Sequence, residues 1–160
     1  MAAQHQARIA LSLSDPWCVD RHRAALRQFL TDHVDILSYN NFGNPESKTN
    51  AMARAAVAAL EQRHVDFEFD GEMTGDIALD YELMKARYPF CRLTGPANIL
   101  VMPGLHSANI AFKLVDQLGS VSVIGPMMLG GEFPFQIVQM GASVNDLVHA
   151  AAIAAYDAVR

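Results

Sequence analysis

The chain of 160 residues is 51% hydrophobic and 18% charged, which suffices for one hydrophobic core but not for two independent domains. Its formal net charge of −5 disfavours partners that are bound through many phosphates, so we expect no nucleic acid and no membrane among its partners. Cys18 and Cys91 form no CxxC pair, the first residues lack the features of a signal peptide, and no apolar stretch approaches the roughly 20 residues of a membrane span. These features predict one cytoplasmic domain.

The first part of the chain is predicted to be helical and then to enter a sheet. After a short helical start, Asp15 and Pro16 have the pattern of an N-cap and first helical residue, opening a helix that ends near Thr31. Residues 34–38 form the first predicted strand, and an alanine-rich stretch over residues 48–63 forms the next helix.

The middle of the chain alternates predicted strands and helices. Residues 67–69 form a short strand, and Asp80 caps a helix that ends at Arg87. The unbroken apolar run at residues 98–102 is typical of a parallel strand that is buried on both faces. An amphipathic helix over residues 107–118 follows it.

The last part continues this alternation. Residues 121–124 and 135–140 are predicted strands, and residues 143–159 form a final helix. Strands that alternate with helices in this way indicate an α/β fold, a three-layer α/β/α domain with a mainly parallel sheet.

Several common chemistries require motifs that this sequence lacks. The histidines include no HExxH pair and no His/Cys cluster with zinc spacing, so we expect no metal site. No GxGxxG motif follows a strand, no P-loop is present, and residues 104–107 have the wrong spacing for a nucleophile elbow. A lone histidine such as His106 is more often structural than catalytic. Dinucleotide-binding, P-loop and serine-hydrolase functions are therefore not expected.

Three segments place glycine and polar residues at the C-terminal ends of predicted strands, at the edge where open α/β sheets bind ligands. They are residues 70–79, 95–109 and 139–146. The first carries three carboxylates in a predicted sharp turn, and the same carboxylates also suit a turn with helix-capping acids: Asp70, Glu72 and Asp76.

The other two segments also allow two interpretations. Backbone amides near Gly104 could receive an anion at the start of a helix, or Ser107 could simply be the N-cap of that helix. In the last segment, Ser143 and Asp146 stand at capping-box spacing, which by itself explains both residues structurally.

Four stretches of the chain, in this order and spacing, resemble phosphate acetyl/butyryl transferases: DGEMTGDIAL, LTGPANILVMPGLHSANIAFKL, VIGPMMLG and MGASVNDLVHAAAIAAYDA. The resemblance covers about residues 35–158, and the loop at residues 38–43 is similar to the version of this domain in malic enzymes. It implies part of an isocitrate/isopropylmalate dehydrogenase-like, or phosphotransacetylase, fold. Residues 1–34 would be an N-terminal helical segment, and residues 35–160 the C-terminal part of the transferase domain.

The resemblance also implies roles for single residues. Active transferases of this family are expected to carry an arginine directly before the glycine of the last segment, and an aspartate in the next helix that takes the thiol proton of CoA. Asp146 matches the aspartate, whereas Met140 stands at the arginine position and cannot carry charge. The residues implied to bind ligand are Gly104, Ser107, Asn109, Gly125, Gly130, Gln139, Gly141 and Ser143.

Three functions remain open from the sequence, and with them the question of whether the chain is an enzyme. The first is a catalytically impaired phosphotransacetylase-like domain that binds acetyl-CoA, CoA or a related acyl-CoA, without a covalently bound cofactor, and regulates the catalytic domain of an NADP-dependent, oxaloacetate-decarboxylating malic enzyme. The second is an active phosphate acyltransferase, or its C-terminal piece, in which another arginine such as Arg92 replaces the missing one. The third is an oligomerisation module without a ligand.

The final predicted helix has a wide apolar face. It includes Leu147, Ala150, Ala151, Ala154 and Ala158. Such a face needs a cover, so we expect a homo-oligomer, most simply a two-fold dimer. The alternative is a helix that folds back on its own sheet.

Overall fold

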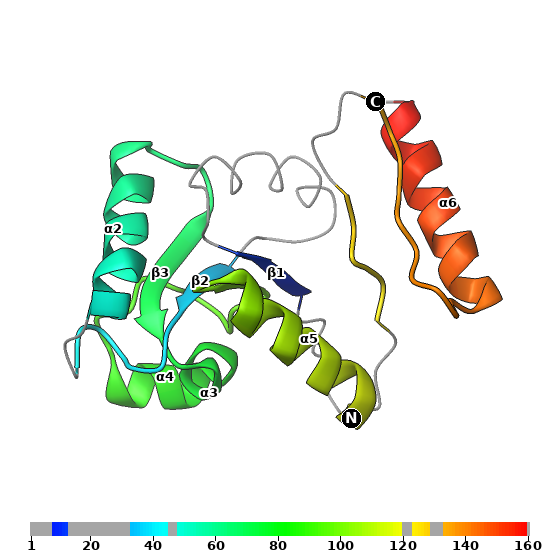
Figure 1. Ribbon diagram of the computed structural model, residues 1–160. Helices are drawn as coiled ribbons and strands as arrows, with labels where there is room; N and C mark the ends of the chain where they lie inside the picture. The colour runs from blue at the N-terminus through cyan, green and yellow to red at the C-terminus, as the bar shows by residue number, and fades with distance from the viewer. Residues whose placement is uncertain (1–7, 13–32, 45–47, 120–122, 129–132, 160) are drawn as a thin grey trace.

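The computed structural model describes residues 8–12, 33–44, 48–119, 123–128 and 133–159. They contain a four-stranded sheet of order β1-β4-β2-β3, in which all neighbours are parallel (Figure 1). The strands are β1 (Arg8–Ser12), β2 (His33–Leu37), β3 (Glu68–Met73) and β4 (Ile99–Met102). The helices are α2 (Lys48–Gln62), α3 (Gly75–Leu79), α4 (Tyr81–Arg87), α5 (Leu105–Leu118) and α6 (Val144–Ala158). The predicted α/β class with a parallel sheet is confirmed.

Helices cover both faces of the sheet because successive strand residues project to opposite sides. One buried cluster joins β2 and β4 to α2, and it contains Val34, Ile36, Ala53, Val57, Leu60, Ile99 and Val101. The other joins the opposite face to α3, α4 and the segment after α4, and it includes Leu37, Met73, Ile77, Met84, Leu93 and Leu100. Burial of each Val, Leu, Ile or Met side chain in these clusters contributes about 1.5–3 kcal/mol to stability, so the two clusters hold the layers together.

Strong local signals in the sequence are confirmed. The predicted strands at residues 34–38 and 98–102 are β2 and β4, and the alanine-rich helix is α2. Asp80 caps α4, since its Oδ1 accepts a hydrogen bond of 3.0 Å from the amide of Leu83. Caps and apolar runs depend on neighbouring residues alone, which is why they could be located without the fold.

The expectation of a helical N-terminal segment is wrong at residues 8–12. These residues form β1, which pairs in parallel with β4, with Arg8 opposite Ile99. A five-residue segment with only three apolar residues has no decisive period, and pairing with a buried strand decided its conformation. The helix predicted from Asp15 to Thr31 lies outside the described residues.

The predicted sharp turn after residue 69 is also wrong. β3 continues to Met73, so Asp70 and Glu72 are strand residues, with Asp70 in register with Asp35 of β2. Gly71, at φ 141°, sits so close to β2 that an added Cβ would lie 2.8 Å from the carbonyl oxygen of Ile36. A close backbone approach therefore explains this glycine, which resembled a turn residue in the sequence.

Residues 123–128 and 133–139 do not form the two further strands that the sequence predicts. The described residues of both segments have no regular secondary structure and lie apart from the sheet, on the right of Figure 1, where the second runs beside α6. Residues 121–122 lie outside the described residues. An apolar run becomes a strand only where a neighbouring strand offers its backbone groups, and none does so here within the described part of the chain. We refer to residues 123–128 and 133–159 as the C-terminal arm.

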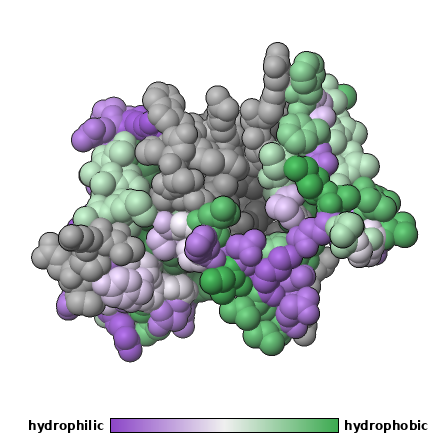
Figure 2. All heavy atoms as spheres, viewed as in Figure 1, coloured by the Kyte–Doolittle hydropathy of each residue, from purple (hydrophilic) through white to green (hydrophobic). Residues whose placement is uncertain are grey.

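The C-terminal arm and α5 are largely exposed. None of the residues of α5 or α6, all of which are described, is buried. Figure 2 shows apolar side chains over α6 and its neighbouring segment, and again over α5. Exposed large apolar side chains on these elements include Ile110, Leu114, Leu118, Phe133, Met140 and Val144. No described helix combines the length and hydropathy that crossing a membrane requires.

Candidate functional site

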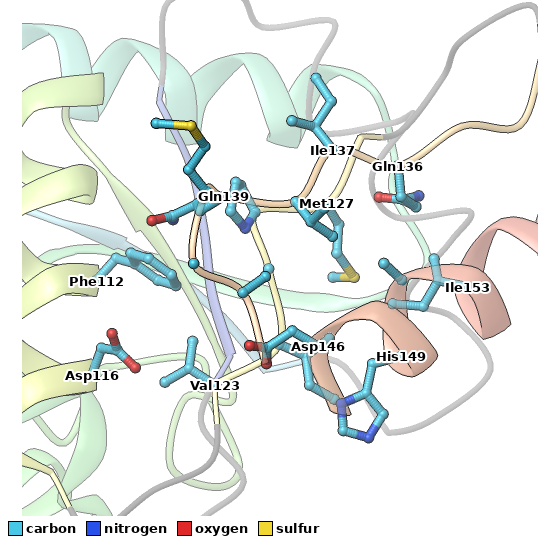
Figure 3. Close-up of a pocket in the computed structure, with 18 of the residues that line it drawn as sticks. Phe112, Asp116, Val123, Met127, Gln136, Ile137, Gln139, Asp146, His149 and Ile153 are labelled. Atoms are coloured by element: carbon cyan, nitrogen blue, oxygen red, sulfur yellow. The ribbon is translucent and has the colours of Figure 1, made fainter. Parts of the chain in front are cut away.

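A cavity of about 240 Å³ lies between α5 and the C-terminal arm. Its walls come from the second half of α5, residues 123–127, residues 136–142 and one side of α6 between Asp146 and Ile153. Figure 3 shows Phe112 and Asp116 on the α5 side and Asp146, His149 and Ile153 on the α6 side. Segments that are far apart in the sequence therefore build this site together.

The cavity carries few charged groups. Of the described residues that line it, Lys113 is the single lysine or arginine, and Asp116 and Asp146 are the two carboxylates. The ammonium of Lys113 donates a hydrogen bond of 2.8 Å to Oε1 of Gln139, which ties α5 to the C-terminal arm. An anionic ligand would therefore meet one fixed positive charge and two negative charges from these walls.

Asp146 lines the cavity but is occupied by its own helix. Its Oδ2 accepts hydrogen bonds from the amide and from the hydroxyl of Ser143, each 2.8 Å long, and its amide donates to Oγ of Ser143 at 3.2 Å. The capping box that the sequence indicates is thus present. The hydrogen bonds from Ser143 lower the pKa of the Asp146 carboxyl, with a smaller effect of His149. A carboxylate stabilised in this way is a weaker base than a free one.

Met140 lines the same cavity and is fully exposed on the turn before Gly141. Gly141 has a φ of 87°, the left-handed region that favours glycine, so the turn positions residue 140 at the cavity rim. A thioether here offers neither charge nor a strong hydrogen bond to a phosphate oxygen.

The structure separates the predicted ligand-binding residues into two groups. Gly125, Gln139 and Gly141 line the cavity together with Asp146. Gly104, Ser107 and Asn109 lie at the start of α5 and do not line it, and Ser143 stands beside it as the cap of α6. Gly130 lies outside the described residues.

The start of α5 differs from the predicted cap. The helix begins at Leu105, two residues earlier than expected, with Gly104 as its N-cap and no side-chain cap. Ser107 lies inside the first turn, and its hydroxyl donates a hydrogen bond of 2.8 Å to the carbonyl of Gly104. The interpretation of Ser107 as the N-cap is therefore wrong.

The acidic residues of β3 form ion pairs rather than an open site. Asp70 accepts hydrogen bonds from Arg92, at 2.7 Å from its amide and 3.1 Å from Nη2, and Glu72 accepts one of 3.2 Å from Arg54. Nη1 of Arg92 also bonds Glu61 at 2.6 Å. Arg92 is engaged there and does not line the cavity, so this arrangement does not support it as a substitute for the arginine that the resemblance implies at position 140. Among the described residues, no group of three His, Cys, Asp or Glu side chains could hold a metal ion.

Sequence reasoning missed the helical side of the cavity. Phe112, Lys113 and Asp116 recur on one side of α5, and His149 and Ile153 follow Asp146 at helical spacing on α6. The expected sites were confined to strand ends and the helix starts that follow them, so residues further along α5 and α6 were not considered. Helical periodicity could have grouped each set of residues, but only the fold shows that the two sets face each other.

Comparison with known proteins is consistent across sequence and structure. The sequence profile described as "Phosphate acetyl/butaryl transferase" matches residues 23–155. An NADP-dependent malic enzyme of Rhizobium meliloti (strain 1021) is 50% identical over 125 residues, which are 78% of this chain and 16% of that enzyme. A phosphate acetyltransferase of Treponema pallidum (strain Nichols) is 39% identical over 122 residues, which are 75% of this chain and 36% of that protein.

Solved structures agree with these similarities. A phosphotransacetylase from Streptococcus pyogenes superposes with a TM-score of 0.81 at 26% identity, covering 90% of this chain and 44% of that chain. The EutD phosphotransacetylase from Staphylococcus aureus gives a TM-score of 0.79 at 25% identity, covering 94% of this chain and 48% of that chain. The chain thus spans less than half the length of each of these relatives.

Proposed function

The chain belongs to the phosphate acetyl/butaryl transferase family, and on that premise we propose that it is a phosphotransacetylase-like domain of impaired activity that binds acetyl-CoA or a related acyl-CoA and regulates a malic enzyme. Domains of this kind also form the C-terminal part of malic enzymes, and 50% identity to one of them favours this context. Ligand binding and the loss of transferase activity are tested by the experiments below.

The observation that carries the proposal is the charge of the cavity. Met140 stands where the resemblance implies an arginine, and Lys113 is the single fixed cation among the described lining residues. Loss of one preorganised charge at a developing anion typically costs about 3–4 kcal/mol, or roughly 10²–10³ in rate. Asp146 adds to this deficit, because its bonds to Ser143 make it a weaker base.

Binding tolerates this loss better than catalysis does. Affinity is distributed over many contacts, whereas rate depends on charges that act only in the transition state. The cavity of about 240 Å³ is smaller than the roughly 300–1,000 Å³ of typical ligand pockets, so it would hold the acyl end of such a ligand rather than the whole of CoA. The amides at the start of α5 remain a second place for an anionic group.

An active phosphate acyltransferase is the second candidate. It is favoured by the presence of Asp146 at the cavity and by 39% identity to a phosphate acetyltransferase. In this case a cation from residues outside the described part of the chain, or from another polypeptide, would stand in for the missing arginine.

A third candidate is an assembly module without a ligand, supported by the exposed apolar residues of α6. Self-association is also compatible with the first two functions. Leu147, Val148 and Ala151 are exposed and available to a second copy, whereas Ala150 and Ala154 are half-buried within the chain. We therefore propose a homodimer through the outer face of α6, a narrower face than the sequence indicated.

Calorimetric titration with acetyl-CoA, CoA and acetyl phosphate separates these functions. A regulatory domain should bind acetyl-CoA, and Lys113→Gln should weaken that binding because it removes the cation of the cavity. Arg87→Gln, which removes an exposed cation on α4 away from the cavity, is the matched control and should bind normally. If no CoA ester binds at millimolar concentration, the assembly module becomes the better description.

An assay with acetyl phosphate and CoA tests the impairment directly. We expect no acetyl transfer above background, and we expect Met140→Arg alone to restore little, since catalytic groups act as a strongly non-additive unit. Turnover by the unmodified chain that disappears in Asp146→Asn would instead establish an active transferase.

A further inference from the structure

Asp35 is a fully buried carboxyl at the centre of the sheet and is not among the residues that line the cavity. It occupies the middle of β2, in register with Asp70 of β3 and Leu100 of β4. Side chains in register on parallel strands project to the same face, so Asp35 and Asp70 share one side of the sheet. That side is the one that α3, α4 and the segment after α4 cover with apolar side chains.

The two carboxyl groups have opposite surroundings. Asp70 accepts three hydrogen bonds, from the amide of Gly71 at 3.0 Å and from the amide and Nη2 of Arg92 at 2.7 and 3.1 Å. Neither carboxyl oxygen of Asp35 has a hydrogen-bond partner among the described residues. An ionised carboxylate without partners in such a place is strongly disfavoured, and the neighbouring charge of Asp70 disfavours it further.

The other polar groups on this face do not compensate Asp35. At the strand starts, His33 and Glu68 pair with each other at 3.5 Å. After α4, Arg92 is shared by Asp70 and Glu61. From α4, Lys85 donates to the carbonyl of Cys91 at 2.8 Å.

The remaining elements among the described residues bring no cation to this place. The Cys91 thiol stays neutral, because burial raises its pKa to about 11. β4 contributes Leu100, α5 contributes alanines, and α3 contributes Ile77 and Ala78, while Asp76 of α3 is exposed.

We propose that Asp35 is held as a neutral carboxylic acid beside the ionised Asp70, and that this one buried proton makes the pairing of β2 with β3 sensitive to pH. Burial raises the pKa of the Asp35 carboxyl well above its usual range, and the charge of Asp70 raises it further. The amide of Ile36 opposes the shift in part, without reaching hydrogen-bond geometry. This inference does not depend on the function proposed above.

The direction of the pH effect follows from proton linkage. The folded chain keeps a proton on Asp35 that the unfolded chain releases near pH ~3.9. The contribution of Asp35 to stability is therefore complete below that pH and is lost as the pH rises toward the raised pKa of the folded state. Over this window the folding equilibrium constant falls by up to about tenfold per pH unit, and above it the effect is constant.

Ionisation of Asp35 would act on the edge of the sheet that leads to the loop at residues 39–44. Two backbone hydrogen bonds of 2.8 Å join that region to β3, from the amide of Ser38 to Met73 and from the amide of Phe42 to Glu72. Repulsion between Asp35 and Asp70 would separate β2 from β3 and weaken these bonds. Amide exchange at Ser38 and Phe42 at alkaline pH should therefore be faster in the unmodified chain than in Asp35→Asn.

Urea unfolding of the full chain across pH tests the proposal. Asp35→Asn keeps the shape and removes the ionisation, and Asp116→Asn removes one exposed charge as the matched control. As the pH rises above ~3.9, we expect the folding constant of the unmodified chain and of Asp116→Asn to fall more steeply than that of Asp35→Asn, by up to about tenfold per pH unit for as long as Asp35 keeps its proton in the folded chain. Parallel pH profiles for all three proteins would overturn the proposal.

A spectroscopic measurement decides the matter even if Asp35→Asn fails to fold. In the unmodified chain labelled with ¹³C-aspartate, the carboxyl carbon of Asp35, assigned through its backbone, should have the chemical shift of a protonated acid at neutral pH. An ionised Asp35 at neutral pH would show that the proton is absent and would refute the inference.

Discussion

We call residues 8–12, 33–44 and 48–119 the sheet body. The sheet body and the C-terminal arm both contain many large apolar side chains, but only the sheet body has a buried core. Met73, Met84 and Leu93 of the sheet body have 0% exposure, whereas Met140 and Val144 of the arm are 104% and 76% exposed. α6 nevertheless forms, since a capping box and an alanine-rich sequence stabilise a helix locally. Local signals are therefore enough to make a helix, but they do not provide it with a buried face.

The contrast also places the candidate site. The cavity lies where the two regions meet, with α5 of the sheet body on one side and the arm on the other. The hydrogen bond from Lys113 to Gln139 is a polar contact that crosses this boundary. Anything that covers the arm, whether a ligand or a second chain, should therefore change the stability of the arm more than that of the sheet body.

The largest expected effect is the loss of stability caused by removing a buried side chain from the sheet body. Leu93→Ala should reduce the free energy of unfolding by about 2–5 kcal/mol, because Leu93 is fully buried and its space cannot collapse completely. Leu147→Ala makes the same chemical change at a site in the arm that is 49% exposed, and should cost much less at concentrations where the chain is monomeric. Equal losses in urea unfolding would show that α6 packs as tightly as the core.

A bound ligand should raise the stability of the C-terminal arm toward that of the sheet body. At a free acetyl-CoA concentration about 100 times its dissociation constant, linkage predicts roughly 2.7 kcal/mol of added stability and a clear rise in melting temperature. Hydrogen exchange should place the new protection at α5 and the arm, with little change in α2. An unchanged melting temperature at millimolar acetyl-CoA would count against a CoA-ester sensor.

A charge on the outer face of α6 should disrupt the proposed homodimer. Ala151→Glu would place two like charges close together across a two-fold contact and should weaken association by about 2 kcal/mol, or roughly 30-fold. Ala58→Glu, on the exposed side of α2, introduces the same charge in the sheet body and serves as the control. Light scattering over a dilution series measures both. A monomer at all concentrations, or a dimer that survives Ala151→Glu, would remove this face from an interface.

The smallest expected effect is the loss of a helix cap in the arm. Ser143→Ala removes the hydroxyl that accepts from the amide of Asp146 and should cost about 1 kcal/mol of helix stability. Because α6 has little packing on the sheet, this loss should appear as fraying of α6 in hydrogen exchange rather than as a lower unfolding midpoint of the sheet body. If the protection of α6 and the unfolding midpoint of the sheet body fell together, the two regions would unfold as one cooperative unit.

Elements with local sequence signals could be predicted without the fold. The apolar run of β4, the alanine-rich α2, the Asp80 cap and the capping box of Ser143 with Asp146 depend on residues within a few positions of one another, and all four are present. The family resemblance was likewise readable, because it rests on the order and spacing of four sequence motifs.

Tertiary structure alone decided the features that join distant residues. β1 is a strand because β4 lies beside it and pairs with its backbone. Residues 123–128 and 133–139 are irregular because no described strand pairs with them. The acids of the supposed turn became members of β3, where register brings Asp70 opposite Asp35 and Arg92 compensates only one of the two. The cavity depends in the same way on α5 and α6 facing each other. Hydrophobic periodicity reports which side of an element is apolar, but the partner of that side is chosen by three-dimensional packing.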